Sequence, residues 1–281
     1  MIAIVESGST KADWLIVNSS KKNQYQTQGF NPFFHSYKDV YDHLQEHSYL
    51  KELRYKLKEI HFYGAGCSSD QLNKKIADGL SMFFPDASIS VDHDLKASAL
   101  SLYQGQPLVA CILGTGSNSC FYDGQSLEEK VPALGFILGD EGSGCDFGKK
   151  LLRDFLYDDL PSELKTDFIQ SGFTKSMIFD RVYASSGANV FIASTARFLI
   201  KHKSLDYSQN LIDNGINSFL DKHVFCYDMK RVANVGFVGS IAKLLEKELR
   251  EICSSRGVSV GRIIQRPLES LAEYHLSSSS K

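Results

Sequence analysis

Three short glycine-rich stretches combine small residues with hydroxyl side chains in a pattern suited to binding an anion. They are Ser7–Lys11, Gly114–Asn118 and Gly236–Ser240, and each follows or ends an apolar run typical of a strand. A glycine turn after a strand lets backbone N–H groups approach an anion closely, and hydroxyl side chains add further donors. One such stretch alone is more often an ordinary tight turn. Three of them together favour phosphate binding.

Carboxylates at two further places are candidates for chemistry. Gly139–Gly144 sets Asp140 and Glu141 side by side in a glycine-rich turn before an expected helix. Asp140 or Ser143 could simply cap that helix, so capping and ligand binding are equal alternatives there. Asp94 stands where a strand is expected to give way to a helix, where a carboxylate can cap the helix or accept the proton of an attacking hydroxyl.

Two familiar nucleotide-binding motifs do not fit the chain. A Walker loop has four residues between its first glycine and Gly-Lys-[Ser/Thr], whereas Gly144–Lys150 has three and lacks the hydroxyl. The stretch Gly64–Ser69 follows an expected strand but lacks the third glycine of a dinucleotide fingerprint. A different type of nucleotide site is therefore expected.

The elements that must position these residues run in the same order twice. Apolar periodicity in the first half predicts strands at 2–5, 14–17, 24–28, 60–63 and 87–91, and helices at 39–57, at 70–83 with Asp70 as cap, and at 94–103. The order begins again with strands at 108–113 and 119–122, a mainly helical stretch at 145–227, a strand at 231–238 and a helix at 240–253. We predict an internal duplication, with the domain boundary near Gly105 and Pro107.

The bulk composition excludes several classes of protein. The chain has 281 residues, 43% of them hydrophobic, which suits two cores, and its net charge of −2 provides no broad positive field for nucleic acid or anionic lipid. The six cysteines lack the spacing of a zinc site, so we expect reduced, mostly buried thiols. The start of the chain lacks the features of a signal peptide, and no apolar run approaches the ~20 residues of a membrane span. We expect a cytoplasmic protein with neither nucleic-acid nor membrane partners.

Taken together, these stretches resemble the N-acetylglucosamine kinases and the wider family that includes the activator ATPases of benzoyl-CoA reductase. The resemblance spans nearly the whole chain and rests on segments in a common order: 6–14 (ESGSTKADW), 29–32 (GFNP), Asp94, 114–118 (GTGSN), 139–143 (GDEGS) and 236–240 (GFVGS). It implies an α/β fold of two duplicated ribonuclease H-like, actin-like ATPase lobes with an interdomain cleft. It also implies three segments: an N-terminal lobe at 1–105, a C-terminal lobe at 106–264, and a C-terminal helix at 265–281 that packs back on the first lobe.

The same resemblance implies roles for individual residues, with ATP and Mg²⁺ as cofactors. Asp94 is expected to be the catalytic base, with Asp92 as a nearby rival, and Glu6 to orient the metal. Nucleotide binding is expected of Gly8, Ser9, Thr10, Lys11, Thr115, Gly116, Gly239 and Ser240. Sugar binding is expected of Asn31, Asn118, Gly135 and Asp140.

The chain departs from the family pattern at two places. Glu6 stands where the family usually has an aspartate, and it is one methylene longer. Residues 132–135 read Pro-Ala-Leu-Gly where the animal enzymes have Gly-Gly-Trp-Gly, so Leu134 replaces the tryptophan beside the acetamido pocket.

The function expected from these observations is ATP-dependent phosphorylation of a hydroxyl of N-acetylglucosamine or a related amino sugar, by an enzyme that could act as a homodimer. One alternative is an ATPase that activates a redox partner through an iron–sulfur cluster, with Cys120 and Cys145 as ligands, although buried structural thiols are the favoured explanation for both. A further alternative, prompted by Glu6, is a catalytically weak sugar sensor.

Overall fold

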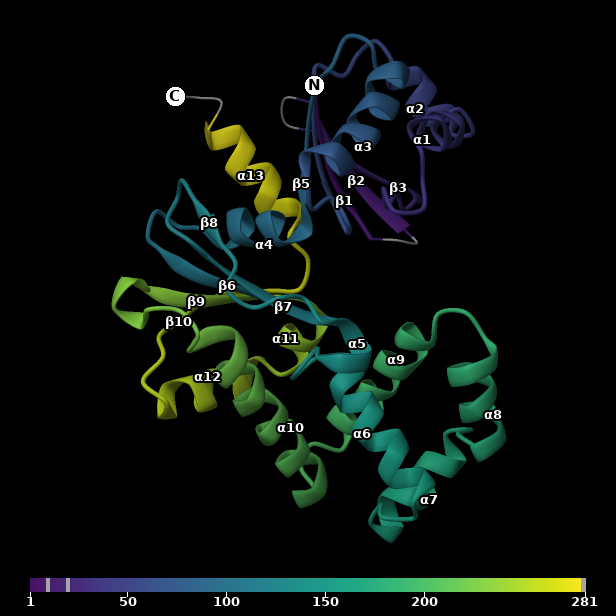
Figure 1. Ribbon diagram of the computed structural model, residues 1–281, viewed down its shortest axis with the longest axis vertical. Coiled ribbons are helices and arrows are strands. Elements are labelled where there is room, and N and C mark those ends of the chain that lie inside the picture. Colours follow the sequence, from purple (N-terminus) through teal and green to yellow (C-terminus); the bar gives the residue numbers. More distant parts are fainter. Residues whose placement is uncertain (9–10, 19–20, 279–281) are drawn as a thin grey trace. The chain divides into compact units, whose positions relative to one another are not determined.

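The chain divides into two compact units in the computed structural model, which describes residues 1–8, 11–18 and 21–278 (Figure 1). Unit 1 comprises residues 1–101 together with the segment from Pro267 onward, and unit 2 comprises residues 102–266. Within the part of the chain that is described, no helix has the length and apolar character required to cross a membrane.

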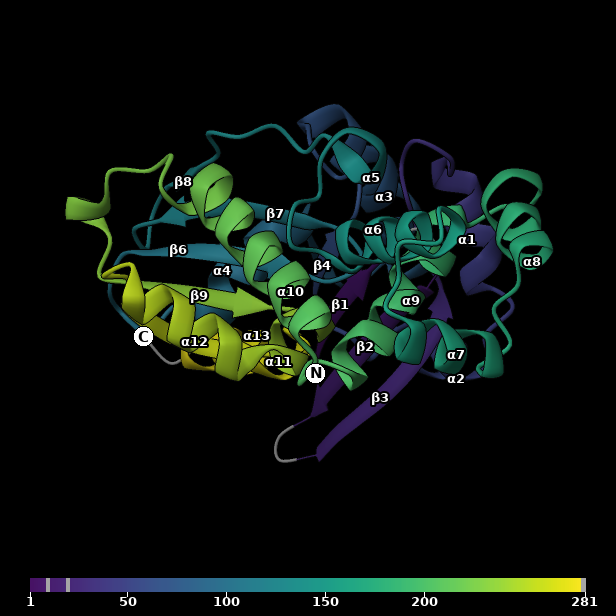
Figure 2. The ribbon, with the colours of Figure 1, turned by 90° about the horizontal axis from the view of Figure 1, so that it is seen from below.

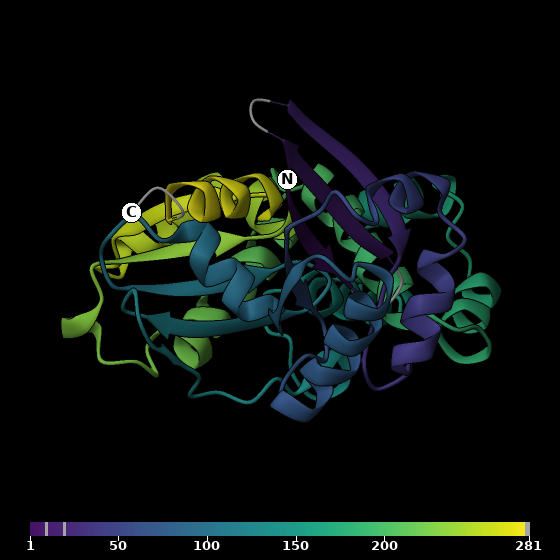
Figure 3. The same cartoon turned by 90° about the horizontal axis from the view of Figure 1, so that it is seen from above.

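Unit 1 is built on a five-stranded sheet in the order β3-β2-β1-β4-β5. Its strands are β1 (Ile2–Ser7), β2 (Lys11–Asn18), β3 (Lys21–Gln28), β4 (Glu59–Gly64) and β5 (Ser88–His93). β1, β2 and β3 pair antiparallel, whereas β4 pairs parallel to β1 and β5 parallel to β4. Figure 3 shows β2 and β3, in purple, running side by side. The carboxyl ends of β1, β4 and β5 therefore meet at one edge of the sheet.

Helices cover both faces of this sheet. On one face, Ala3, Val5 and Phe62 join a buried apolar cluster with side chains of α1 (Tyr37–Leu44), α2 (Ser48–Leu53) and α3 (Asp70–Phe83). Because neighbouring strand residues point to opposite faces, His61 and Tyr63 face the other side. There they contact His275 of α13 (Leu268–Ser278), which also packs against β1 and β2. The C-terminal helix thus belongs to the unit built by the N-terminal residues.

Unit 2 repeats the topology of unit 1. Its sheet has the order β10-β9-β6-β7-β8, formed by β6 (Leu108–Leu113), β7 (Ser117–Tyr122), β8 (Leu127–Glu128), β9 (Asn234–Val238) and β10 (Val260–Ile264). β6, β7 and β8 pair antiparallel, whereas β9 pairs parallel to β6 and β10 parallel to β9. Each strand of unit 2 therefore has a counterpart in unit 1 at the same place and in the same direction, and the predicted duplication is confirmed.

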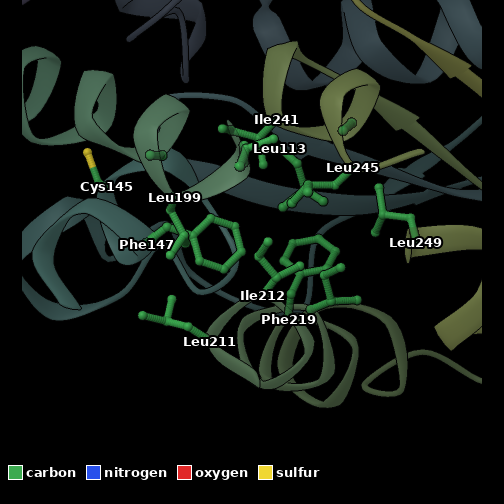
Figure 4. Close-up of a cluster of buried hydrophobic side chains, with 14 of the residues drawn as sticks. Leu113, Cys145, Phe147, Leu199, Leu211, Ile212, Phe219, Ile241, Leu245 and Leu249 are labelled. Carbon is green, nitrogen blue, oxygen red and sulfur yellow. The ribbon is translucent and has the colours of Figure 1, made fainter. Parts of the chain in front are cut away.

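A long helical segment separates β8 from β9, and two more helices lie between β9 and β10. The helices are α5 (Gly135–Leu138), α6 (Gly144–Leu156), α7 (Ser162–Gln170), α8 (Lys175–Phe179), η1 (Asp180–Ala184), α9 (Ala188–Lys201), α10 (Asp206–Phe219), η2 (Leu220–Val224), η3 (Met229–Arg231), α11 (Ser240–Leu244) and α12 (Glu246–Ser255). α6 and α9 pack side by side (Figure 2). The core joins Leu113 of β6 with Phe147, Leu199 and Phe219 of the surrounding helices and with Leu245 between α11 and α12 (Figure 4).

The structure corrects several expected boundaries. The helix expected at 39–57 is two helices, because His47 adopts an extended conformation between them. Leu44 and Leu50 are both buried, and six residues apart they would point in different directions on one continuous helix. Ser69, rather than Asp70, caps α3 by accepting the Leu72 N–H.

Other differences concern short elements. The expected helix at 240–253 is interrupted at Leu245, and the expected strand at 231–238 begins at Asn234 after a 3₁₀ turn. β8, α5 and β10 were not predicted, since each is short and none has a clear periodicity. All six cysteines are free thiols and five are buried, as expected.

Candidate active site

The residues expected to act in unit 1 gather at the carboxyl ends of its parallel strands. Glu6 and Gly8 lie at the end of β1. The Gly8 N–H donates to the Lys11 carbonyl at 2.9 Å, so Gly8 and Lys11 close a turn. Ser9 and Thr10, the other two predicted phosphate-binding residues of this turn, lie outside the described residues.

Glu6 has a second carboxylate beside it. It stands directly opposite Asp13 in the β1–β2 ladder, so both side chains lie on the same face of the sheet. Lys11 Nζ lies 2.9 Å from the Asp13 carboxylate, and Gln26 donates to it at 2.8 Å. Within the described ranges, no group of three or more His, Cys, Asp or Glu residues is arranged to hold a metal ion. Two carboxylates fit Mg²⁺ that keeps most of its waters and takes further ligands from phosphates.

Asn31 is held at the same edge by a loop after β3. The Phe30 N–H donates to Ser7 Oγ at 2.8 Å, which ties this loop to the end of β1. Asn31 is buried, and its Oδ1 accepts the Phe33 N–H at 3.0 Å. A Cβ at Gly66, in the loop after β4, would lie 2.6 Å from the same Oδ1, so this close approach favours glycine.

Asp94 begins α4 (Asp94–Leu102) immediately after β5, and the residue is exposed. Burial raises the pKa of the nearby Cys67 thiol to about 12, and the charges of Asp94 and Asp92 add to this shift. Asp92 binds Lys96 Nζ at 2.6 Å and accepts the His93 N–H at 2.9 Å. These contacts engage both Asp92 oxygens, which favours Asp94 over Asp92 as the base.

In unit 2, Thr115 and Gly116 form a turn fixed by backbone hydrogen bonds. The Gly114 N–H donates to the Gly116 carbonyl at 3.0 Å. The first two amides of α6, from Gly144 and Cys145, donate to the carbonyls of Gly114 and Thr115 at 2.9 and 3.0 Å. The turn is therefore held at the start of a long helix, with the Thr115 side chain exposed.

Gly239 links β9 to α11 beside this turn, and Ser240 is the first residue of α11. Gly239 has φ of 134°, a conformation that L-residues rarely adopt. A Cβ there would lie 2.1 Å from the Leu113 carbonyl oxygen and 3.1 Å from the Gly114 nitrogen. Only glycine permits this approach between the ends of β6 and β9.

The Asp140 carboxylate lies against the same turn. It accepts the Ser117 N–H at 3.2 Å, and a Cβ at Gly116 would be 2.7 Å from its other oxygen. Burial raises the pKa of Asp140. Gly135 is connected to this region because its carbonyl accepts the Gly139 N–H at 2.9 Å. Ser143, not Asp140, caps α6 by accepting the Asp146 N–H, so the Asp140 side chain is left for another role.

A pocket of about 300 Å³ opens beside Asp140 within unit 2. Its lining combines apolar residues with polar ones: Val131, Pro132, Leu134 and Gly139 among the first, and Ser117, Asp140, Glu141, Lys222 and His223 among the second. Asn118 does not line it, because neighbouring residues of β7 point to opposite faces of the sheet and Ser117 takes the pocket side. The Asn118 Oδ1 accepts the Ser119 N–H at 2.8 Å.

Sequence reasoning missed part of this lining. Glu141 stands next to a predicted residue and could have been included on that ground. Lys222 and His223 come from η2, far along the chain, and nothing in their sequence neighbourhood marks them. The π-helical turn that presents them is a feature often found at functional sites, but it is visible only in the fold.

Comparison with known proteins gave matches among solved structures. No family model matched the chain, and neither did any curated protein. A protein of Porphyromonas gingivalis described as an N-acetylglucosamine kinase is 33% identical, with a TM-score of 0.91 over 99% of this chain and 100% of that one. A Chromobacterium violaceum protein with the same description is 15% identical, with a TM-score of 0.70 over 97% of this chain and 98% of that one.

A more distant likeness is to a ROK family glucokinase of Streptomyces griseus, whose structure contains glucose and AMPPNP. It is 13% identical, with a TM-score of 0.57 over 96% of this chain and 97% of that one. At this identity the likeness concerns the fold, and it confirms the predicted two-lobed α/β class.

Proposed function

The chain belongs to the N-acetylglucosamine kinase family, and from this we propose that it transfers the γ-phosphoryl group of ATP to a hydroxyl of N-acetylglucosamine or a related amino sugar. Membership rests on 33% identity over 99% of the chain. The observation that carries the proposal is the pocket of unit 2, where Asp140 joins a monosaccharide-sized space to the glycine turn 114–116.

The nucleotide side of the proposal assigns ATP to glycine turns in both units. Thr115 and Gly116 bind phosphate, and Gly239 with Ser240 contacts the nucleoside. The close approach of Gly239 to the end of β6 supports this assignment, because it places the start of α11 next to the turn 114–116. In unit 1, the turn from Gly8 to Lys11 has the same task, including Ser9 and Thr10.

The sugar part of the proposal uses both the apolar and the polar residues that line the pocket. Its volume of about 300 Å³ lies at the lower end of the usual range for small-molecule sites. Val131, Pro132 and Leu134 offer an apolar surface for the methyl of an acetamido group, so Leu134 takes the place of the tryptophan of animal relatives. Asp140 and Gly135 bind hydroxyls from unit 2, and Asn31 and Asn118 complete the proposed set.

Asp94 is the proposed catalytic base. Its carboxylate accepts the proton of the attacking sugar hydroxyl while the new P–O bond forms and the bond to the leaving ADP oxygen breaks. Desolvation by the surrounding protein atoms raises the pKa of Asp94, and the backbone N–H groups at the start of the helix only partly oppose this shift. A raised pKa supports this role, because it favours uptake of the proton.

Mg²⁺ is part of the proposal, held by Glu6 with Asp13 opposite it. When bound, the ion neutralises charge on the phosphates. The longer Glu6 side chain can reach a metal-bound water, and Lys11 and Gln26 hold the Asp13 carboxylate in position.

A sugar panel tests the proposed reaction. ADP release is measured with ATP, Mg²⁺ and a range of hexoses, amino sugars and N-acetylated amino sugars, and the product is identified by phosphorus NMR. We expect N-acetylglucosamine or a close relative to give the highest kcat/KM. If every sugar in the panel leaves ADP release at background, the kinase proposal fails.

Membership of the wider family that contains benzoyl-CoA reductase activators is supported by the order of motifs alone. The redox role itself is disfavoured, because Cys120 and Cys145 are both buried and burial raises the pKa of Cys145 to about 11. Such thiols stay protonated, whereas cluster ligands are thiolates. An anaerobic preparation with stoichiometric iron would reverse this preference.

Cytoplasmic location and a homodimer complete the proposal. The free state of all six cysteines supports a reducing compartment. Light scattering after size-exclusion chromatography tests the assembly, and a monomer mass at micromolar concentration would exclude the dimer.

A further inference from the structure

Two adjacent carboxylates line the pocket of unit 2 but have different partners. The Asp140 carboxylate accepts the N–H of Ser117, the first residue of β7. Its own backbone lies in the left-handed region, with φ of 64°, which is uncommon outside glycine and changes the direction of the chain at this point. The next side chain, Glu141, faces another wall of the pocket, where its Oε2 lies 3.5 Å from His223 Nε2.

His223 is held rigidly behind this carboxylate. Its ring stacks on Phe219 with centroids 4.8 Å apart and planes 14° apart, and only 4% of its side chain is exposed. The carbonyl of His223 accepts a hydrogen bond from Ser119 Oγ at 2.6 Å, which fixes η2 against β7. The imidazole therefore has one orientation, set by a stack on one side and a backbone anchor on the other.

The protonation of His223 follows from its partners. Burial lowers its pKa, so the ring is neutral at physiological pH and carries one N–H. Within the described part of the chain, Nδ1 is buried and has no hydrogen-bond partner. A buried N–H without an acceptor is costly, so we assign the proton to Nε2, where the Glu141 carboxylate accepts it. The ring thus donates one hydrogen bond and adds no charge.

This arrangement leaves Glu141 available to a ligand. A carboxylate has about four acceptor sites, and the imidazole uses one of them. The side chain of Glu141 is 30% exposed and lines the pocket, as does the exposed Lys222. A neutral donor orients the carboxylate without cancelling its charge, unlike the Lys150–Asp146 pair on α6, where the ion pair occupies the acid at 2.9 Å.

We propose that Glu141 selects the sugar by accepting hydrogen bonds from its hydroxyl or amide N–H groups, and that His223 positions Glu141 for this task. The inference rests on the proposed function and names the specificity-determining group within it. A site built to bind a donor rejects analogues that lack it, because the bound analogue displaces water from the carboxylate and offers no hydrogen bond in its place. Sugars without the matching donor are therefore expected to be poor ligands.

Calorimetric titration with N-acetylglucosamine tests the proposal on the full chain, with Glu141→Gln, His223→Phe and His223→Gln. We expect Glu141→Gln to weaken sugar binding about tenfold or more, since the amide oxygen still accepts but the charge that strengthens the hydrogen bond is lost. His223→Phe keeps the stack on Phe219 but cannot donate, so we expect a similar loss. The amide of His223→Gln can replace the Nε2 donor, so we expect binding within about threefold of wild type.

Two controls accompany these variants. Glu251→Gln removes an exposed carboxylate on α12, 64% exposed at its side chain, and should leave sugar binding unchanged. Affinity for ATP should stay within about twofold in all variants, because the glycine turns are not altered. Thermal melting confirms that each variant is folded.

The outcomes are distinct. Unchanged sugar affinity in Glu141→Gln overturns the role of Glu141, and equal losses in His223→Gln and His223→Phe overturn the positioning role of His223. Wild-type protein that binds no sugar and shows no sugar-stimulated ADP release overturns the proposed function, and this inference with it. That last result appears before any variant is made, so the two failures can be told apart.

Discussion

The two units share one sheet topology but differ in what lies between the third and fourth strands. In unit 1 the connection is residues 29–58, with two short helices, whereas in unit 2 it is residues 129–233, with most of the helices of that unit. Asp140, Glu141 and His223 all lie in this longer connection. The repeated sheet provides a common edge, and the insertion in one copy provides the pocket.

The strand ends of the two units also differ in chemistry. In unit 1, Glu6 is the last residue but one of β1, and Asp94 follows β5. In unit 2, the apolar Ile112 is the last residue but one of β6, and Gln265 and Arg266 follow β10. On the proposed function, metal binding and proton transfer belong to unit 1, whereas most of the sugar-binding residues, all except Asn31, belong to unit 2.

Asp94→Asn is expected to have the largest effect of the variants that test this division. We expect kcat for the sugar to fall by about 10²- to 10⁴-fold with ATP affinity unchanged, because the amide cannot accept the proton. Steady-state kinetics and nucleotide titration measure both quantities. Asp92→Asn serves as the matched control and should cost less than about fivefold, since Asp92 is engaged by Lys96. Equal losses in the two variants would remove Asp94 from the role of base.

Gly239→Ala tests how tightly the backbone packs after β9, the unit 2 counterpart of β4. In unit 2 the new Cβ would lie 2.1 Å from a backbone oxygen of Leu113, whereas Gly66 after β4 in unit 1 meets the side chain of Asn31. We expect Gly239→Ala to lower the free energy of unfolding by more than ~3 kcal/mol, from backbone strain and the clash.

Gly257→Ala is the control that separates the cost of backbone strain from the cost of the steric clash in Gly239→Ala. Gly257 also has positive φ, 72°, but a Cβ there meets no described atom within 4 Å. Its cost should be about 1 kcal/mol, the strain alone. Urea denaturation followed by far-UV circular dichroism measures both variants, and similar losses would mean that the β6–β9 contact can relax.

The buried histidines give a pH test that distinguishes the units. Burial, with the neighbouring His61, lowers the pKa of His275 in unit 1 to about 4 from the usual 6.5. The unfolded chain then binds a proton that the folded unit does not, so stability is lost as pH falls from 6.5 towards 4, by roughly 3 kcal/mol at most. His275→Phe keeps a ring on His61 but cannot titrate, and it should flatten this slope.

Fluorescence provides the readout for this test, because Trp14 is the one tryptophan of the chain and is buried in unit 1. Its unfolding curve between pH 4 and 6.5 therefore reports on unit 1. His223→Phe, in unit 2, is the control and should leave the Trp14 curve unchanged. An unaltered slope in His275→Phe would show that other groups govern the acid sensitivity of unit 1.

Helix caps supply the smallest expected difference. Ser143 caps α6 in unit 2 and is fully buried, whereas Ser69 caps α3 in unit 1 and is exposed. Water can replace the lost hydrogen bond only at the exposed cap, so Ser143→Ala should cost about 2 kcal/mol and Ser69→Ala about 0.5. Urea denaturation of both variants checks the order, and the reverse order would contradict the burial argument.

Local patterns predicted the sheets better than the helices. The apolar runs at 2–5 and 14–17 predicted the β1–β2 hairpin, because two apolar runs so close together in the chain can pair directly. The helix predicted over 39–57 failed because the pattern does not reveal that Leu44 and Leu50 must reach the same core. β10 was missed because a five-residue strand at a sheet edge carries little periodic signal.

By itself, the sequence determined the duplicated α/β architecture, the glycine turns at strand ends and the candidate carboxylates, since all of these depend on residues close together in the chain. Tertiary structure alone decided that the His223 ring lies beside Glu141 and that Asn118 points away from the pocket. Those facts depend on which segments that are far apart in the chain come into contact. Burial and packing across the whole fold determine these contacts, and no local sequence pattern encodes them.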